Sequence, residues 1–511
     1  MVAVSRIAKG TDQQEALWDS LVKDDNHVLV EARAGTGKST ACREGMHRVL
    51  SQKPHTRIRY AVFSKANADE FREACPERVS VGTVHSFGFE VLRMAYRSVF
   101  EKNKSYILMD RIREARCVPR TLRRTIAGLV SHAKNAAILP DDEKLPEKLS
   151  MLAEFFSVQM GGKSLMVLDV ADKVLKAAAD CTDLVDFDDM IWMPAVHQLT
   201  FPAVDQIYLD EVQDWNPAQH ALLPLLCQRG RVIAVGDRWQ SIYGFRGADM
   251  DSIPRLEGML HARREGLRAF PLTITWRCPR SHVAMAQEYV SDIQARDNAP
   301  EGEISYIDEA TADYLPGEMV LCPTNAPLIA AALRLIAQRR RAVVRGRAVG
   351  EQLTGIVRSL GEARTVLELT RKVEKWRTDN LERLADMDGV DDVIEEVKDK
   401  ADGILAVLAS CDSPAVVESR MAELFDDSKK PGESGPVVFS TIHRAKGLEA
   451  DRVKLMECPA RKPTQEWEHR QARNLRYVAL TRSKQSLCFV EMEATKKAKK
   501  ARQDKGEEVG Y

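Results

Sequence analysis

The chain has 511 residues, of which 44% are hydrophobic and 29% charged, and its 75 basic side chains balance its 75 acidic ones. This length exceeds what one hydrophobic core usually organises, so we expect several domains in a soluble globular protein. The zero net charge does not indicate any particular class of binding partner. It excludes a uniformly basic surface, so a nucleic-acid contact has to come from a local basic patch.

Cysteine usage and hydropathy indicate the cellular compartment in which we expect the protein. The ten cysteines form no Cys-x-x-Cys pair, which argues against structural zinc or a disulfide framework and favours a reducing environment. The N-terminus lacks a signal-type apolar core, and no apolar run approaches the ~18 residues of a membrane helix. We therefore expect a cytoplasmic protein, or a nuclear one in a eukaryote, with no membrane association.

The N-terminal elements lead into a phosphate-binding pattern. A helix is predicted to begin near Asp12 with Thr11 as its N-cap. Gln13 lies in its first turn, where the spacing alone favours a solvated side chain over a ligand contact. An apolar strand at residues 28–30 comes next, and the following helix is predicted from Ser39 to about Leu50.

The loop between that strand and that helix is the segment around which the chain is organised. Strand, glycine loop and helix in this order predict a site where backbone N–H groups and the helix N-terminus face a phosphate. Lys38 supplies a charge to the terminal phosphates and Ser39 a hydroxyl to Mg²⁺. Ala32 stands where the usual pattern opens with glycine. The predicted nucleotide-binding residues are Ala34, Gly35, Thr36, Gly37, Lys38, Ser39 and Thr40.

Apolar strands that end in polar residues predict an open parallel sheet with its ligand edge at the strand C-termini. A strand at residues 59–63 ends in a polar turn, and residues 79–87 are expected to pass from strand to loop. Strands at 204–209 and 231–235 run into Asp210-Glu211 and Gly236-Asp237. The mostly helical segment that separates these strands is therefore predicted to be an insertion.

A second alternation of strands and helices begins near residues 272–275, includes 319–322 and resumes at 437–441 and 487–490. A charged helical block interrupts it, and two apolar stripes there predict packing faces, with partner binding as the alternative. Residues 426–436 predict a linker. The stripes are Val366, Leu369, Val373 and Trp376, and then Val393, Val397, Ala401, Ile404 and Leu408.

Two further stretches can support chemistry. Asp210 and Glu211 provide the carboxylates that nucleotide hydrolysis needs, Asp210 to hold Mg²⁺ and Glu211 to orient and deprotonate the attacking water. Gln240 comes after a strand edge where a γ-phosphate could be sensed. After it come Tyr243, Phe245 and Arg246, which could grip a nucleic-acid strand or could be core residues of a turn.

In order and spacing, these motifs resemble those of superfamily 1 DNA helicases of the UvrD and Rep type. The resemblance runs from Gln13 to about Ser483 and is carried by Gln13, the phosphate loop and residues 63–67, 82–87, 210–214, 240–248, 275–278, 441–449 and 477–482. It implies an α/β fold with two RecA-like P-loop domains, each with a parallel sheet and a mainly helical inserted subdomain. The implied boundaries are 1–90 with 200–270 for the first domain, 91–199 for its insertion, 271–345 with 436–495 for the second domain, 346–435 for its insertion, and 496–511 for a basic tail.

The resemblance also implies roles for individual residues toward ATP, Mg²⁺ and DNA. Gln13 would read the adenine edge, Trp276 would stack on the base where the family usually has tyrosine, and Glu449 would touch the ribose. Gln240, Arg277 and Arg482 would reach the γ-phosphate, the arginines being supplied by the second domain. The positions that match strand contacts are Phe63, His85, Tyr243, Phe245, Arg246 and His443.

The implied function is an ATP-dependent DNA helicase or single-strand translocase that moves 3′ to 5′ and acts on single strands and duplex junctions. Its expected setting is DNA repair, replication or recombination, with proteins of those processes as candidate partners. Two alternatives stay open: an ATPase that strips proteins from DNA, and a nucleotide-gated protein-interaction module. RNA also stays open as a substrate, because stacking on bases does not sense the 2′-hydroxyl. The chain departs from the family at Gln471 and Ala472, where glutamates are common, and in a shorter second insertion. The segment after Arg482 is too short for a nuclease domain.

Overall fold

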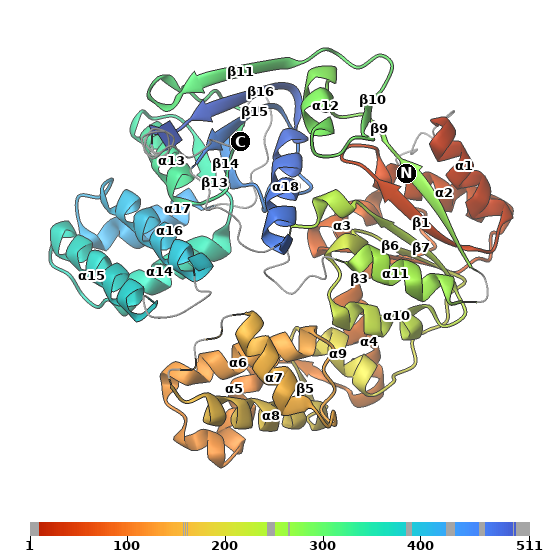
Figure 1. Ribbon diagram of the computed structural model, residues 1–511, viewed down its shortest axis with the longest axis horizontal. Helices are drawn as coiled ribbons and strands as arrows, with labels where there is room; N and C mark the ends of the chain where they lie inside the picture. Colours follow the sequence, from red (N-terminus) through yellow and green to blue (C-terminus); the bar gives the residue numbers. More distant parts are fainter. Residues whose placement is uncertain are drawn as a thin grey trace. The chain divides into compact units, whose positions relative to one another are not determined.

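The computed structural model describes residues 10–156, 158, 160, 162–242, 251–263, 266–384, 391–425, 435–458, 466–493 and 495–496 (Figure 1). The chain divides into two units, Met1–Thr273 and Ile274–Tyr511. Each unit contains a six-stranded sheet whose pairings are parallel. The α/β class with two parallel sheets, expected from the strand and helix alternation, is therefore confirmed.

The first sheet has the strand order β3-β2-β6-β7-β1-β8. Its central strands are buried along almost their whole length, as parallel strands covered on both faces must be. Asp210 and Asp237 come directly after two neighbouring strands, so both lie at the carboxyl edge. The strands are β1 (His27–Ala32), β2 (Ile58–Val62), β3 (Val79–Thr83), β6 (Gln206–Leu209), β7 (Arg231–Gly236) and β8 (Leu267–Leu272).

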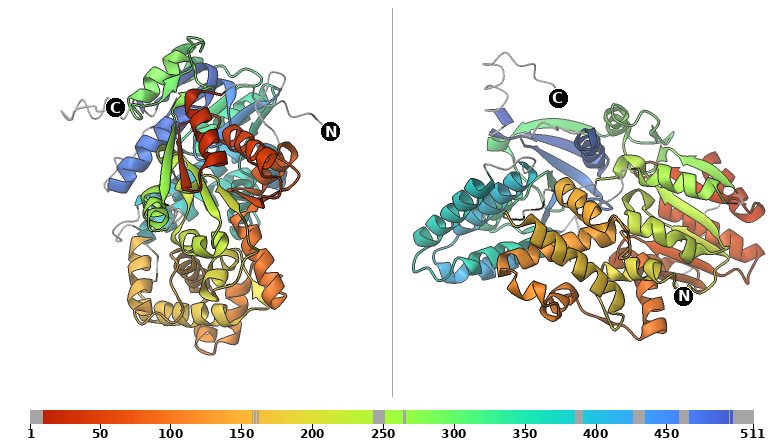
Figure 2. Two further views of the ribbon diagram at one scale, coloured as in Figure 1. Left: turned by 90° about the vertical axis from the view of Figure 1, so that its right-hand side faces the viewer. Right: turned by 60° about the horizontal axis from the view of Figure 1, so that its bottom comes forward.

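Helices cover both faces of this sheet (Figure 2). Along β1, Val28 and Val30 join one apolar cluster and Leu29 joins another, because successive strand residues point to opposite faces. The first cluster contains α1 (Asp12–Lys23), α2 (Lys38–Gln52) and α3 (Lys65–Ala74). The second contains α4 (Val84–Tyr96), α10 (Pro217–Cys227) and α11 (Ser252–His261).

Local capping explains where two of these helices begin. The Thr11 hydroxyl accepts from the Gln14 N–H at 3.2 Å, which confirms Thr11 as the N-cap of α1. The expected loop after residue 83 was wrong, because α4 starts at Val84 directly after β3. Thr83 and Ser86 form a reciprocal capping box there, so the chain needs no intervening loop.

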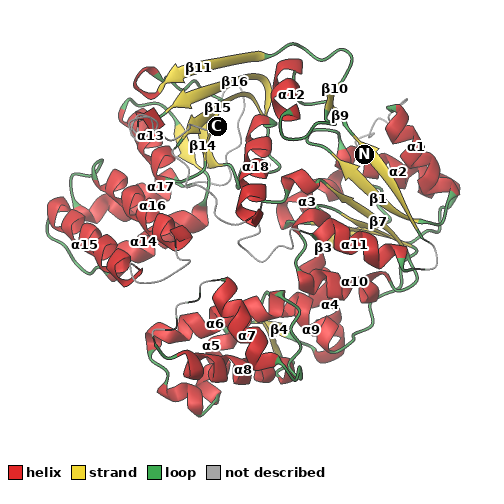
Figure 3. Cartoon of the chain, in the orientation of Figure 1, coloured by secondary structure: helices red, strands yellow, loops and turns green. Residues whose placement is uncertain are grey.

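The helical block between β3 and β6 has a core of its own (Figure 3). Helices α4 and α9 connect this core to the sheet, since Phe87 and Ile191 pack under the sheet whereas Leu92 and Trp192 pack in the block. Gly88 permits their close crossing, because a Cβ there would lie 1.7 Å from the Met190 carbonyl oxygen. The block contains β4 (Val99–Phe100), α5 (Lys104–Arg111), α6 (Arg120–Asn135), α7 (Leu145–Phe155), α8 (Ser164–Asp180), β5 (Leu184–Val185) and α9 (Asp189–Val196).

The second sheet has the strand order β11-β16-β15-β12-β14-β13. The strand expected at residues 272–275 is divided, since Leu272 ends β8 of the first sheet and β9 (Ile274–Thr275) pairs only with β10 (Gln294–Ala295) among the described strands. The sheet strands are β11 (Glu303–Asp308), β12 (Met319–Cys322), β13 (Ala342–Val344), β14 (Val437–Thr441), β15 (Ala450–Glu457) and β16 (Ser483–Glu491). The helices are α12 (Arg280–Gln287), α13 (Ala326–Ala337), α14 (Arg347–Ser359), α15 (Val366–Leu384), α16 (Asp391–Leu408), α17 (Val417–Leu424) and α18 (Glu466–Leu480).

Leu369, Val373 and Ile404 of the two apolar stripes on α15 and α16 pack inward, as expected for packing faces, whereas the side chain of Val393 lies outside the described part of the chain. Leu369, Val373 and Ile404 are almost fully buried and share one apolar cluster with Ile329 of α13 and Phe439 of β14. The second helical block is therefore continuous with the core of the sheet. Most of the predicted linker at 426–436 and most of the basic tail lie outside the described residues.

Folding also brings together two cysteines that are far apart in sequence. The thiols of Cys322 and Cys458, at the ends of β12 and β15, lie 3.1 Å apart.

Among the helices that the structure describes, none combines the length and apolar character needed to cross a membrane.

Candidate nucleotide site and strand-contacting residues

The phosphate loop is formed by the turn between β1 and α2. Gly35 and Gly37 have φ values of 72° and 79°, a left-handed conformation that glycine adopts without strain. Gly37 is the N-cap of α2, so Lys38, Ser39 and Thr40 make up the first helical turn, where main-chain N–H groups have no partner within the helix. A Cβ on Gly37 would lie 3.8 Å from Gln14 Nε2, which places the start of α1 beside the loop.

Three carboxylates surround the Lys38 ammonium. Its Nζ lies 3.0 Å from Glu211 Oε1, and Asp210 and Asp237 also interact with it electrostatically. Glu211 has a φ of 52°, which is uncommon for a residue other than glycine and turns the chain sharply after β6. Gln213 connects two of the acids, since its Nε2 donates to Glu211 Oε2 and its Oε1 accepts from the Asp237 N–H at 3.0 Å.

The acids and the lysine of this cluster shift one another's pKa values. Burial and, after it, the neighbouring Glu211 raise the pKa of Asp210 to about 6, against the opposing effect of Lys38. Tyr60 on β2 donates its hydroxyl to Asp210 Oδ2 at 3.1 Å. Burial lowers the pKa of Lys38, but Glu211, Asp210 and Asp237 outweigh it, so this pKa is raised and the ammonium stays charged.

Gln240 lies against the same cluster. Its Nε2 donates to Asp237 Oδ2 at 2.7 Å, and the other oxygen of Asp237 accepts from the Trp239 N–H at 3.2 Å. The sequence motif that begins at Gln240 is therefore joined to the carboxylate edge by Asp237. Tyr243, Phe245 and Arg246 lie outside the described residues.

Gln13 is held by the residue after the last strand of the first sheet rather than left in solvent. Its Nε2 donates to Thr273 Oγ1 at 2.9 Å, and its Oε1 accepts from the Thr273 N–H at 2.9 Å. Both ends of the amide are therefore engaged by one residue. An adenine edge would have to exchange with Thr273 for these bonds.

The second unit brings three of the predicted residues together. Arg277 Nε donates to Glu449 Oε2 at 2.7 Å, and Lys484 Nζ lies 2.6 Å from the other carboxylate oxygen. Burial raises the pKa of Glu449, but the cations Arg277 and Lys484 outweigh it and lower the pKa. Arg277 Nη1 also donates to the Thr481 carbonyl, next to Arg482, at 3.3 Å.

Arg482 is buried beside this pair, with a residue exposure of 1%. Its guanidinium donates to the carbonyls of Val478 and Leu448 and to the Thr481 hydroxyl at 2.8, 3.2 and 3.1 Å. Trp276 differs, since it is 49% exposed and has the Arg296 guanidinium 5.9 Å from its ring centroid.

Two of the predicted strand-contacting residues come after β2 and β3 at the carboxyl edge of the first sheet. Phe63 is 46% exposed directly after β2. His85, in the first turn of α4, stacks on Phe187 with ring centroids 4.0 Å apart. Burial lowers the pKa of His85 to about 4, against the opposing effect of Asp188, so the imidazole is neutral at physiological pH. His443 lies after β14 in the second unit.

Comparison with known proteins covers most of this chain. The profile of the UvrD/REP helicase N-terminal domain matches residues 11–260, and that of the UvrD-like helicase C-terminal domain matches residues 330–494. The chain belongs to the UvrD/Rep helicase family.

Curated relatives are similar over about half of this UvrD/Rep chain. The ATP-dependent DNA helicase PcrA of Leuconostoc citreum is 27% identical over 292 residues, which cover 50% of this chain and 36% of the relative. A probable DNA helicase II homologue of Mycoplasma pneumoniae is 26% identical over 317 residues, with coverage of 55% and 42%. PcrA of Bacillus subtilis (strain 168) is 27% identical over 278 residues, with coverage of 48% and 35%. The matched part of the chain therefore spans about two fifths of the length of these relatives.

Several residues of the site were missed by sequence reasoning. Tyr60 and Gln213 contact the predicted carboxylates, and Asp237 completes their cluster. Asp237 carried a usable signal, since it comes directly after a buried strand. Thr273 and Phe187 carried none, because their partners Gln13 and His85 are far away in sequence.

Proposed function

We propose that this UvrD/Rep family member uses ATP hydrolysis to move along single-stranded DNA and to separate duplexes at junctions. The observation that carries the proposal is the Lys38 ammonium among Glu211, Asp210 and Asp237, at the edge where the phosphate loop ends. Lys38 alone carries too little charge to balance three carboxylates, even with Arg33 acting on Asp237. Such a cluster favours binding of a further cation, which a metal-bound triphosphate supplies.

The donor set fits Mg²⁺. The Ser39 hydroxyl and the Asp210 carboxylate provide the oxygen ligands that this ion prefers, together with phosphate oxygens. When bound, Mg²⁺ would neutralise charge on the β- and γ-phosphates. Burial and, after it, Glu211 keep the pKa of Asp210 raised although Lys38 opposes them, and a bound Mg²⁺ would favour the ionised carboxylate.

The contact between Lys38 and Glu211 suggests how the chain keeps its base inactive before substrate binds. At 3.0 Å, Lys38 holds the Glu211 carboxylate in an ion pair. We infer that a bound γ-phosphate replaces Glu211 as the ion-pair partner of Lys38. This exchange releases the Glu211 carboxylate to orient and deprotonate the attacking water. Gln240, linked to Asp237, is positioned to sense the same phosphate.

The proposal also assigns roles to residues of the second unit. Arg277 and Arg482 stabilise charge on the γ-phosphate, and Glu449 keeps Arg277 oriented through the 2.7 Å contact. Trp276 stacks on the base and Gln13 reads its edge after exchanging with Thr273. Binding and hydrolysis of ATP then drive movement along the strand.

We assign strand binding to the aromatic edge formed by Phe63, His85 and Phe187, with His443 and the segment containing Tyr243, Phe245 and Arg246. Stacking on aromatic rings contributes about 1–3 kcal/mol per base. Opening a base-pair step costs about 1.4 kcal/mol on average, so alternate gripping by stacked rings can support unwinding. We expect 3′ to 5′ movement and a role in DNA repair, replication or recombination.

Steady-state ATPase assays with and without oligo(dT) test the proposal. We expect single-stranded DNA to stimulate hydrolysis strongly in the wild type and to have no effect in Glu211→Gln, which keeps the shape of the side chain. An exposed control, Lys23→Met, should behave as the wild type, since Lys23 pairs with the exposed Asp19. Hydrolysis that is indifferent to DNA over a range of salt would refute the proposal.

Duplexes with a 3′ or a 5′ single-stranded tail test the direction. The proposal expects unwinding from the 3′ tail, and the same assay with RNA tails measures discrimination of the 2′-hydroxyl. Displacement of streptavidin from biotinylated DNA without strand separation would instead identify a translocase that strips bound proteins.

A further inference from the structure

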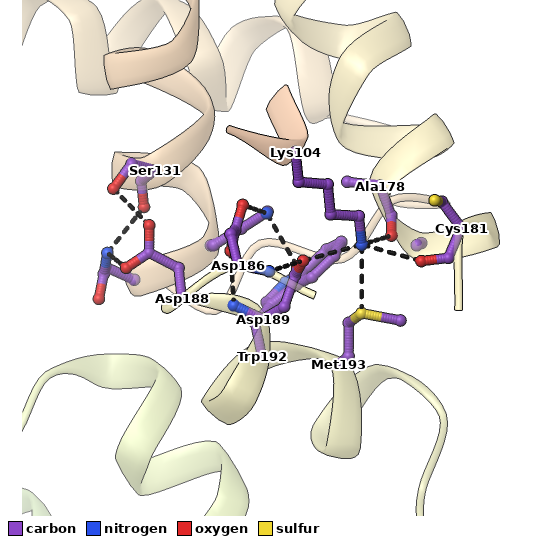
Figure 4. Close-up of polar contacts among 12 residues, drawn as sticks. Lys104, Ser131, Ala178, Cys181, Asp186, Asp188, Asp189, Trp192 and Met193 are labelled. Carbon is purple, nitrogen blue, oxygen red and sulfur yellow. Dashed lines mark hydrogen bonds and ion pairs between the residues drawn. The ribbon is translucent and has the colours of Figure 1, made fainter. Parts of the chain in front are cut away.

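A buried ionic network occupies the core of the first helical block (Figure 4). Lys104 of α5 and Asp189 of α9 have no exposed surface, and Lys134 of α6 is 1% exposed. Buried charges are costly unless they are paired and hydrogen-bonded. A block whose core is otherwise apolar has therefore retained four charged side chains, including Asp186, for which the proposed hydrolysis has no use.

Each lysine is fully engaged. Lys104 Nζ lies 2.8 Å from Asp189 Oδ2 and donates to the carbonyls of Ala178 and Cys181 at 2.8 and 2.9 Å. Lys134 Nζ lies 2.6 Å from Asp186 Oδ2 and 2.8 Å from Asp189 Oδ1. The network thus joins α5, α6 and α8 to a short segment that leads into α9 and includes its first residue (Figure 4).

That segment, residues 186–189, has three aspartates that all point inward. Asp186 and Asp189 exchange side-chain to backbone bonds of 2.9 and 3.0 Å, which fixes the turn. Asp188 accepts from Ser131 Oγ at 2.6 Å and from Asn135 Nδ2 at 3.0 Å. The remaining residue, Phe187, is 58% exposed and stacks on His85.

Lys134 and Asp189 favour their charged forms in the folded protein, whereas burial and, after it, the neighbouring Asp189 raise the pKa of Asp186 against the opposing effect of Lys134. Burial lowers the pKa of Lys134, but Asp189 and Asp186 outweigh it and raise the pKa. Burial raises the pKa of Asp189, but Lys134 and Lys104 outweigh it and lower the pKa. Lys104, Lys134, Asp186 and Asp189 hold one turn through directional contacts from several elements, and such a satisfied polar network specifies a position.

We propose that the buried network of Lys104, Lys134, Asp186 and Asp189 is a positioning device that fixes the Phe187 ring against His85 as a stacking face for a nucleic-acid base. The inference rests on the proposed function, because the stacking face needs a strand to bind. Lys104 and Lys134 themselves touch no substrate and act only through the turn that carries Phe187.

A double-mutant cycle tests this assignment in the full chain. The double variant Lys134→Met with Asp186→Asn removes one positive and one negative charge together, and the asparagine oxygen still accepts the Asp189 N–H. We measure the dissociation constant for fluorescent oligo(dT) by anisotropy without ATP, and DNA-independent ATPase activity. Phe187→Ala completes the cycle.

We expect the network variant and Phe187→Ala each to weaken oligo(dT) binding about tenfold, with DNA-independent ATPase activity unchanged in the network variant. Combined, they should weaken binding no more than about twofold beyond Phe187→Ala alone, because both act through one ring. Leu149→Ala, which opens a cavity in the same block at a residue with no exposed surface, is the matched control. It should lower the melting temperature and leave binding unchanged.

Three results would overturn the inference. The first is multiplicative effects of the two changes, the second is unchanged binding in either variant, and the third is equal weakening by Leu149→Ala. A wild-type chain that does not bind oligo(dT) would reject the proposed function and, with it, this role for the network. If one of the three results is obtained while the wild type binds oligo(dT) and its ATPase activity responds to DNA, only the positioning role fails and the proposed function stands.

Discussion

Replacing Lys38 by methionine should destabilise the first unit in a pH-dependent way. The change keeps the length of the side chain and removes the ammonium that faces Glu211, Asp210 and Asp237. Burial raises the pKa of Asp210 and of Asp237, and the Lys38 ammonium lowers both pKa values. Without it, both pKa values rise further.

The direction of the pH effect comes from proton linkage. A carboxyl whose folded pKa lies above its unfolded value binds more protons when folded, so the free energy of unfolding falls as pH rises through that interval. In the wild type this interval for Asp210 ends near pH 6, because its folded pKa is about 6. In the variant it extends to higher pH, so the two proteins diverge above pH 6.

The size of the effect depends on the burial of the pair. Leaving buried charge unpaired costs about 3–5 kcal/mol, and each kcal/mol lowers the melting temperature by about 2–4 °C in a domain of this size. We therefore expect a loss of about 6–20 °C at pH 8. At pH 5 the Asp210 carboxyl is mostly protonated and does not need the ammonium, so the loss should be smaller.

Differential scanning fluorimetry of the two proteins at pH 5 and pH 8, without nucleotide, measures this difference. Lys23→Met, which breaks an exposed pair with Asp19, controls for loss of a surface charge and should change the melting temperature by no more than about 2 °C. An equal loss at both pH values would show that the three carboxylates do not depend on Lys38 for their charge.

Three further changes test other parts of the account. Asp210→Asn should abolish ATP hydrolysis and yet raise the melting temperature at pH 8 by about 4 °C, because it removes a carboxyl with a raised pKa. This gain in melting temperature should shrink toward pH 4. A lower melting temperature of the variant at pH 8 would contradict the reasoning. Glu449→Gln should lower kcat/KM for ATP about tenfold, because Arg277 Nε loses a charge-assisted bond of about 1.5 kcal/mol, and an unchanged value would exclude Glu449 as its positioning partner. Gly88→Ala should lower the melting temperature by several degrees, because its Cβ would meet the Met190 carbonyl, whereas Gly128→Ala on α6 meets nothing within 4 Å and should not.

Local features of the fold could be predicted from the sequence because they depend on neighbouring residues. The Thr11 cap, the strand before the phosphate loop and the helix after it each depend on a few adjacent side chains. The exception is residue 83, where a capping box ends the strand and starts a helix at once. Polar residues such as Thr83 and Ser86 are as typical of a loop as of a helix start, so the sequence alone did not favour the helix.

Contacts between distant segments could not be predicted from spacing. The pairing of Tyr60 with Asp210 depends on β2 and β6 being neighbours in the sheet, which only the crossover topology decides. The same holds for Gln13 with Thr273. The buried lysines of the helical block carried no signal either, because Lys104 and Lys134 look like surface residues until their partners are known.

The central claim, that hydrolysis moves this chain along single-stranded DNA, is tested most directly by stopped-flow translocation on oligo(dT) of increasing length with a fluorophore at the 5′ end. The account predicts an arrival signal that needs ATP, is absent in Glu211→Gln and is delayed in proportion to oligonucleotide length. A signal whose timing does not depend on length, in a protein that hydrolyses ATP, would contradict it.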